Sequence, residues 1–140
     1  MEQRLSILTL GVSDLKTAEK FYIEVFGWEK SPMSQPTIIF LKMNGLLLSL
    51  YPLQKFKEEV NLDVKKEGFP TFTMAYNARS EAEVNILFEQ FKERGAKILK
   101  MPEKVFWGGY SGYISDPDGY FWEIAFNPFL KLDEAGNIIE

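Results

Sequence analysis

The sequence contains neither cysteine nor histidine among its 140 residues. Without cysteine there is no disulfide, no zinc–thiolate site, no iron–sulfur cluster and no thiol nucleophile. Without histidine, the commonest transition-metal ligand and the commonest general base are both missing. A Ser-His-Asp triad and an imidazole-ligated metal centre are therefore excluded before any motif is considered.

Long apolar runs and a strong excess of one charge are also missing. The 16 basic and 20 acidic residues give a net charge of −4, and the basic residues are scattered, which argues against nucleic acid as a partner. No apolar run approaches the ~20 residues of a membrane-spanning helix. The first residues lack the pattern of a secretory signal. We expect a cytoplasmic protein that binds neither nucleic acid nor a membrane.

Bulky rings and apolar residues are abundant instead. Twelve Phe, six Tyr and three Trp occur in a chain that is 46% hydrophobic. This composition is typical of a folded chain rather than a disordered one, and the length fits one domain of about 100–150 residues.

The first half of the chain predicts a βαβββ order. Residues 5–12 alternate like a strand, and the apolar stripe of residues 15–26 predicts a helix, which Ser13 or Asp14 can cap and Gly27 can end. The strands expected after it are Trp28–Met33, Thr37–Met43 and Leu46–Tyr51, the last two joined by an Asn44-Gly45 hairpin.

The second half predicts the same order. A strand over residues 70–77 precedes a capping box, Ser80 to Glu83, and a helix that ends at Gly95. Strands are then expected at Ala96–Met101, where Pro102 stops the strand, at Val105–Ser115 and at Tyr120–Asn127, with an Asp-Pro-Asp-Gly turn before the last of them.

The repeated order predicts an α+β fold in one domain. Two βαβββ modules, about residues 4–52 and 69–127, would form a cup-shaped mixed β-sheet with the helices outside. Residues 53–68 are expected to form a short helix or lid that links the modules, and the tail, 128–140, could fold into a small hairpin.

Two stretches of this sequence resemble the vicinal oxygen chelate superfamily, which includes glyoxalase I, bleomycin-resistance proteins and extradiol dioxygenases. The first runs from Ile7 to Leu15 and continues to Phe21-Tyr22 and Phe26-Gly27-Trp28. The second runs from Trp107-Gly108-Gly109-Tyr110 through Asp116-Pro117-Asp118-Gly119 to Trp122-Glu123. The resemblance covers about residues 4–127 and implies a small-molecule site inside the cup and a homodimer.

Metal-dependent members of that superfamily hold an ion with one residue from each of four strands. Carried over, these positions fall on Ile7, Ser49, Thr73 and Glu123. An alkyl group, two hydroxyls and one carboxylate do not make a zinc, iron, nickel or manganese site. The resemblance therefore implies a member without the usual metal-ligand set, and we expect no metal and no other cofactor.

Glu123 is the main candidate site residue. Strand alternation places it with Phe121 on one face, while Trp122, Ile124 and Phe126 face the helices. A carboxylate among aromatic rings is a candidate for ligand contact, and Glu123 is also the candidate catalytic residue. It could equally be a structural carboxylate paired with hydroxyl groups.

The other candidate ligand-binding residues share the inferred cup faces or lie on the glycine-containing strand, where their rings could stack on a planar ligand or on a cation. The alternatives are a cup filled by side chains and rings that belong to the core. The candidates are Thr9, Ser49, Tyr51, Thr73, Trp107, Tyr110, Tyr113 and Phe121.

The sequence thus predicts a protein that binds a small organic molecule in the sheet cup without a transition metal, as the bleomycin-resistance branch does. One alternative is an enzyme, such as a lactoylglutathione lyase-like lyase or isomerase or a dioxygenase, that uses Glu123. Another is a homodimeric assembly module whose cup is filled.

Overall fold

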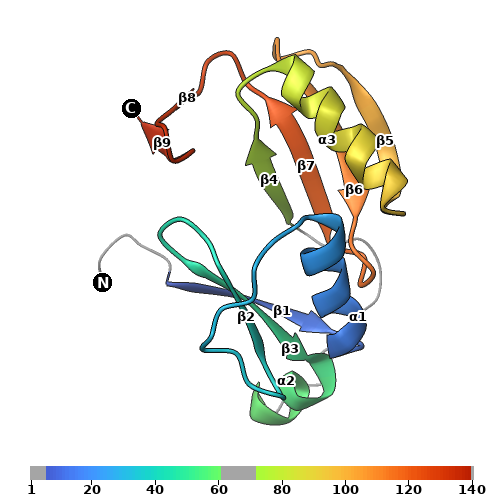
Figure 1. The fold of residues 1–140 in the computed structure, drawn as a ribbon, viewed down its shortest axis with the longest axis vertical. Helices are drawn as coiled ribbons and strands as arrows, with labels where there is room; N and C mark the ends of the chain where they lie inside the picture. The colour runs from blue at the N-terminus through green and yellow to red at the C-terminus, as the bar shows by residue number, and fades with distance from the viewer. Residues whose placement is uncertain (1–5, 61–71, 140) are drawn as a thin grey trace. The chain divides into compact units, whose positions relative to one another are not determined.

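The computed structural model describes residues 6–60 and 72–139, and the chain forms two compact units, Met1–Gly68 and Phe69–Glu140 (Figure 1). In each unit, helices pack against a small β-sheet that has both parallel and antiparallel neighbours. The fold is α+β, as the sequence predicts. Within the described ranges, no helix is long and apolar enough to cross a membrane.

The first unit is built on a three-stranded sheet in the order β1-β3-β2. Strand β1 (Ile7–Val12) runs parallel to β3 (Leu47–Pro52), which runs antiparallel to β2 (Ile39–Lys42). Helix α1 (Leu15–Lys20) leads directly into a π-helical turn, η1 (Phe21–Val25), and helix α2 (Leu53–Val60) follows β3.

The core of the first unit lies between its sheet and α1–η1. Leu10, Leu48 and Leu50 lie on one face of the sheet and expose 1% of their surface or less. The helical segment contributes Ala18 and Tyr22, both completely buried. The apolar face of the sheet thus packs against the apolar face of the helical segment, as the sequence predicts, because each element buries its apolar side.

The ends of this helical segment also follow the sequence. Asp14 caps α1 by accepting a hydrogen bond from the backbone N–H of Thr17 at 2.7 Å. Gly27, with φ of 72°, takes the left-handed conformation that a residue after a helix commonly adopts. The π-helical turn was not predicted, because its wider hydrogen bonding leaves no signature in the apolar stripe.

The strand predicted over Trp28–Met33 is wrong. Only a single bridge, between Lys30 and Leu41, joins this segment to the sheet. The Ser31 N–H bonds the Phe40 carbonyl at 2.8 Å, and the chain then turns, with a hydrogen bond between Ser34 and Ser31. Pro32 has no N–H to donate, so the pairing stops there.

The segment after β3 begins as a helix, α2, one of the two forms expected for residues 53–68. The rest of that expectation, residues 61–68, lies outside the described residues, as do residues 70 and 71 of the strand predicted at 70–77.

The second unit is built on a four-stranded sheet in the order β4-β7-β6-β5. Helix α3 (Glu81–Glu93) covers one face of it (Figure 1). The strands are β4 (Thr73–Asn77), β5 (Lys97–Lys104), β6 (Tyr110–Ser115) and β7 (Phe121–Phe126), and a tail hairpin follows as β8 (Lys131–Leu132) and β9 (Ile138–Ile139).

Two contacts and the strand register identify the face of this sheet that α3 covers. A Cβ on Gly112 would lie 2.6 Å from the Phe88 ring of α3, so this strand position needs glycine. Tyr76 donates a hydrogen bond to Glu83 of α3 at 3.1 Å. Gly112 and Tyr76 both lie opposite Ile124 in the sheet, so Ile124 shares their face. The buried Trp122 therefore also faces the helix, as predicted.

Two strand boundaries in the second unit differ from the prediction. Pro102 does not stop β5, which continues to Lys104, because β5 is an edge strand and its pairing with β6 is irregular between Lys100 and Glu103. The strand predicted at Val105–Ser115 begins only at Tyr110, since residues 105–109 form the turn between β5 and β6.

The predicted cap and turns of this unit are confirmed. The Glu83 N–H bonds Ser80 Oγ at 3.1 Å, and the Glu83 carboxylate accepts the Arg79 N–H at 2.8 Å. Asp116 Oδ1 accepts the backbone N–H groups of Asp118 and Tyr120 in the Asp-Pro-Asp-Gly turn. The tail folds into the small hairpin β8–β9.

Candidate functional site

The candidate site in the second unit lies on the sheet face opposite α3. Glu123 of β7 is flanked by Tyr113 of β6 on one side and by Ala75 of β4 on the other. Phe121, two residues before Glu123, lies opposite Thr73 on the same face. The sheet thus brings Glu123, Tyr113, Phe121 and Thr73 together, although β4 is separated from β6 and β7 by α3 and β5 in the sequence.

Tyr113 and Glu123 interact directly on this face. Both side chains are half-buried, and the Glu123 carboxylate lies close enough to the phenol to act on its pKa, both by its charge and as a hydrogen-bond acceptor. Burial raises the pKa of Tyr113 above the ordinary 10.0, and the negative charge and the acceptor oxygens of Glu123 raise it further. At neutral pH the phenol therefore keeps its proton and can donate a hydrogen bond.

A lysine that was not among the predicted site residues also reaches this part of the sheet. Lys100 of β5 lies opposite Tyr113, and its ammonium pairs with Glu103 at 2.7 Å. The bulge in β5 places Lys100 there, and bulges leave little trace in the alternation of apolar residues. Among the described residues, Glu123 has no ion-pair partner comparable to this one.

Two aromatic candidates lie elsewhere in the second unit. Tyr110 is on β6 but points to the other face, where its hydroxyl bonds Asn85 of α3 at 2.9 Å. Trp107 lies in the turn between β5 and β6, not on a strand, and its ring lies where a side chain on Gly109 would be. The prediction that Trp107 lies on the same strand as Tyr110 and Tyr113 was wrong, because β6 begins only at Tyr110.

The candidates of the first unit share the face of its sheet opposite the leucine core. Thr9 and Ser49 are register partners, and Ser49 Oγ donates to Thr9 Oγ1 at 2.7 Å. Ser49 is 1% exposed and Thr9 is exposed. Tyr51, half-buried, lies two residues further along β3. The closure of the two sheets into one cup stays a prediction.

The four positions carried over for a metal do not fit a transition metal. Ile7 has no donor atom, and the Ser49 hydroxyl is bonded to Thr9. Thr73 offers one neutral hydroxyl, so Glu123 is the single anionic donor. Across residues 6–60 and 72–139, no three Asp or Glu side chains gather closely enough to hold an ion.

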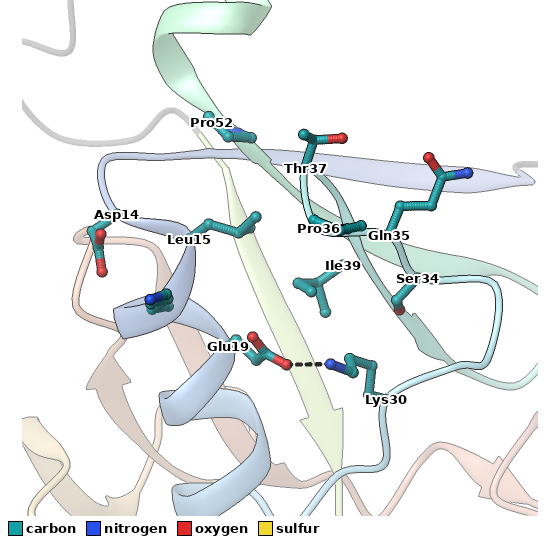
Figure 2. Close-up of a pocket in the computed structure, with 11 residues that line it drawn as sticks. Asp14, Leu15, Glu19, Lys30, Ser34, Gln35, Pro36, Thr37, Ile39 and Pro52 are labelled. Atoms are coloured by element: carbon teal, nitrogen blue, oxygen red, sulfur yellow. Dashed lines mark hydrogen bonds and ion pairs between the residues drawn. The ribbon is translucent and has the colours of Figure 1, made fainter.

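A cleft that the sequence did not predict lies within the first unit (Figure 2). It has a volume of about 750 Å³ and runs between α1 and the loop that precedes β2. Pro36, Ile39 and Pro52 give it an apolar lining, and Glu19 and Lys30 form an ion pair at 2.8 Å across it. Residues 28–33 were predicted to form a strand, so a cleft lined by Lys30 and the loop after it was not expected.

Comparison with known proteins agrees with this architecture. A sequence model of the Glyoxalase/Bleomycin resistance protein/Dioxygenase superfamily matches residues 4–124. The crystal structure of a glyoxalase-related enzyme from Fulvimarina pelagi is 36% identical, with a TM-score of 0.90 over 99% of both chains.

More distant structures share the fold. A lactoylglutathione lyase from Agrobacterium tumefaciens is 24% identical, with a TM-score of 0.70 over 91% of this chain and 96% of that one. A glyoxalase/bleomycin resistance protein/dioxygenase from Nocardioides is 23% identical, with a TM-score of 0.78 over 97% and 91%. Because the family model spans most of the sequence, this chain belongs to the Glyoxalase/Bleomycin resistance protein/Dioxygenase superfamily.

Proposed function

We propose that this protein binds a small organic molecule, without a transition metal, at the Tyr113–Glu123 pair on the sheet face opposite α3. The observation that carries the proposal is the pair itself. A half-buried carboxylate beside a phenol on the neighbouring strand, with no ion-pair partner among the described residues, keeps acceptor capacity for a ligand. Such a partly desolvated group is a typical feature of a binding site.

The neighbours of the pair favour a ligand with both apolar and polar parts. Phe121 offers a half-buried ring, and Thr73 an exposed hydroxyl, on the same face. Small-molecule sites commonly combine apolar walls with a few polar groups that fix orientation. A cationic or neutral ligand suits this face, since Lys100 is already paired with Glu103 and the uncompensated charge is that of Glu123.

A thermal-shift screen with benzylamine, tyramine and benzyl alcohol tests the proposal. At least one of them should raise the melting temperature of the wild-type protein, and Glu123→Gln and Tyr113→Phe should both reduce that rise. Glu89→Gln is the matched control, because Glu89 is exposed on α3 and lies away from this face. No rise with any probe, or a rise that Glu123→Gln leaves unchanged, contradicts the proposal.

The same pair also favours a second candidate function, catalysis by proton transfer without a metal. Glu123 could take a proton from a bound substrate, and the phenol of Tyr113, no longer needed by the protonated Glu123, could then turn its hydrogen bond to the developing anion. The similar protein from Agrobacterium tumefaciens is a lactoylglutathione lyase, so that activity is the first to assay. Activity that disappears in Glu123→Gln supports an enzyme, and binding without turnover supports the binding protein.

A further inference from the structure

The cleft between α1 and the loop before β2 is separate from the Tyr113–Glu123 face. Every residue that lines it belongs to the first unit, whereas Tyr113 and Glu123 belong to the second. It also lies on the helix-covered side of its sheet, since it is bounded by α1 and by the buried Ile39. Its volume of about 750 Å³ is within the range of small-molecule sites, roughly 300–1,000 Å³.

The cleft combines an apolar wall with charged residues of both signs. Leu15 of α1 extends toward Ile39 and Pro36 of the opposite wall (Figure 2). Glu19 and Lys30 neutralise one another at 2.8 Å. The other two charged residues of the lining, Asp14 and Lys16, also have opposite signs, so the cleft as a whole has no net charge that would favour an ion. A charged ligand would lose water against the apolar part of the lining, so the cleft favours neutral ligands.

The Glu19–Lys30 pair still has hydrogen-bonding capacity. The ammonium has three N–H donors and the carboxylate has two oxygens, and the pair joins one nitrogen to one oxygen. A carboxamide matches this arrangement, because its carbonyl can accept from Lys30 while its N–H donates to Glu19. Both bonds would involve a charged partner, which makes them stronger than bonds between neutral groups.

We infer that this cleft is a second binding site, for small neutral molecules that carry a carboxamide on an apolar body. The body lies against Leu15, Ile39 and Pro36, and the carboxamide binds the Glu19–Lys30 pair. The inference is independent of the function proposed for Tyr113–Glu123, because the two sites share no residue.

Benzamide, benzoate and benzamidine test this inference, because they share one ring and differ in charge. In ¹H–¹⁵N correlation spectra of the ¹⁵N-labelled protein, benzamide should shift the amide signals of Leu15, Glu19, Lys30 and Ile39 in a saturable way. Benzoate and benzamidine should bind more weakly at these residues. Equal shifts with all three compounds, or benzamide shifts that avoid the cleft, overturn the inference.

Variants of the pair give the second arm of the test. Glu19→Gln combined with Lys30→Met should weaken benzamide binding about tenfold, the scale of one lost hydrogen bond to a charged group. Lys20→Met combined with Glu24→Gln is the matched control, because this exposed pair on the same helical segment, 3.7 Å apart, does not line the cleft. An unchanged dissociation constant in the first double variant, or an equal loss in the control, overturns the inference.

Leu15→Ala tests the apolar half of the site, and its fold is checked by circular dichroism. It should weaken benzamide binding, whereas Glu123→Gln should leave it unchanged. A loss of benzamide binding in Glu123→Gln would assign the ligand to the other site and overturn the inference. If Leu15→Ala does not fold, the benzamide affinity of the Glu19→Gln and Lys30→Met double variant decides whether the cleft binds the ligand.

Discussion

The Tyr113 phenol holds its proton more tightly in the folded protein than in the unfolded chain. Burial, then the charge and the hydrogen bond of Glu123, raise the pKa of the phenol, so the folded protein keeps the proton at pH values where the unfolded chain loses it. The stabilisation from this proton is complete below pH 10.0, the ordinary pKa, and is lost as pH rises through the higher pKa of the folded state.

We therefore expect the phenolate absorbance of Tyr113 to appear above pH 10.0 in the folded protein. The difference between the alkaline titrations of wild type and Tyr113→Phe isolates this group from Tyr76, whose pKa burial also raises. In Glu123→Gln the pKa of Tyr113 should fall, because the neighbouring negative charge is gone. A Tyr113 titration identical in wild type and Glu123→Gln would show that the pair does not interact.

Gly112 is a residue at which one added methyl group should be costly. A Cβ there would lie 2.6 Å from the Phe88 ring, 2.7 Å from the Lys100 carbonyl oxygen and 2.8 Å from the Pro102 nitrogen, so backbone would have to move. Gly112→Ala should lower the free energy of unfolding by about 1–3 kcal/mol, measured by urea denaturation.

Gly11→Ala is the matched control for that substitution. Its Cβ would lie 2.9 Å from a terminal methyl group of Leu53, the movable end of a side chain. It should therefore cost less than Gly112→Ala. A larger loss of stability in Gly11→Ala would mean that contact with fixed backbone is not the deciding factor.

At the scale of elements, apolar periodicity and capping residues correctly predicted strands, helices and helix ends. The alternation of Leu10, Val12 and their partners, the cap at Asp14 and the glycine after the first helix are all found in the structure. Side-chain pattern determines these features locally, so no tertiary information was needed.

Features that depend on backbone pairing were mispredicted. The strand at Trp28–Met33 has suitable residues, but Pro32 and the turn at Ser31 leave only one bridge, at Lys30. Pro102 suggested an end to β5, yet an edge strand with irregular pairing tolerates proline. Likewise, Glu123 and Tyr113 could each be named from sequence, but their adjacency depends on the register of β6 and β7.

The cap of α3 carries an element-scale prediction. Ser80 Oγ accepts the N–H of Glu83 at 3.1 Å and so satisfies a backbone donor in the first turn of the helix. Ser80→Ala should lower the free energy of unfolding by about 1 kcal/mol, measured by thermal and urea denaturation, and Ser80→Asn should retain most of the stability. Equal losses in both variants would mean that capping is not what Ser80 contributes.

For the whole molecule, the homodimer implied by the superfamily resemblance stays a prediction. Phe106, fully exposed in the turn before β6, and Phe129, 77% exposed, are large apolar side chains that an interface would cover. Analytical ultracentrifugation should give twice the mass of one chain. A monomer at all concentrations would exclude the assembly-module alternative.

The absence of histidine and cysteine from the whole sequence also leads to a prediction about metal binding, because it removes the commonest transition-metal ligands from every possible site. Of the four positions carried over from metal-dependent relatives, Glu123 alone offers an anionic donor, and it lies beside the Tyr113 phenol. A metal present at a thousand times its dissociation constant would stabilise the fold by about 4 kcal/mol, which a melting curve detects easily. We expect dialysis against a chelator to leave the melting temperature unchanged. Protein purified without chelator should hold no stoichiometric Ni, Zn, Mn or Fe, and such a metal, if lost in Glu123→Gln, would contradict the proposed metal-free binding.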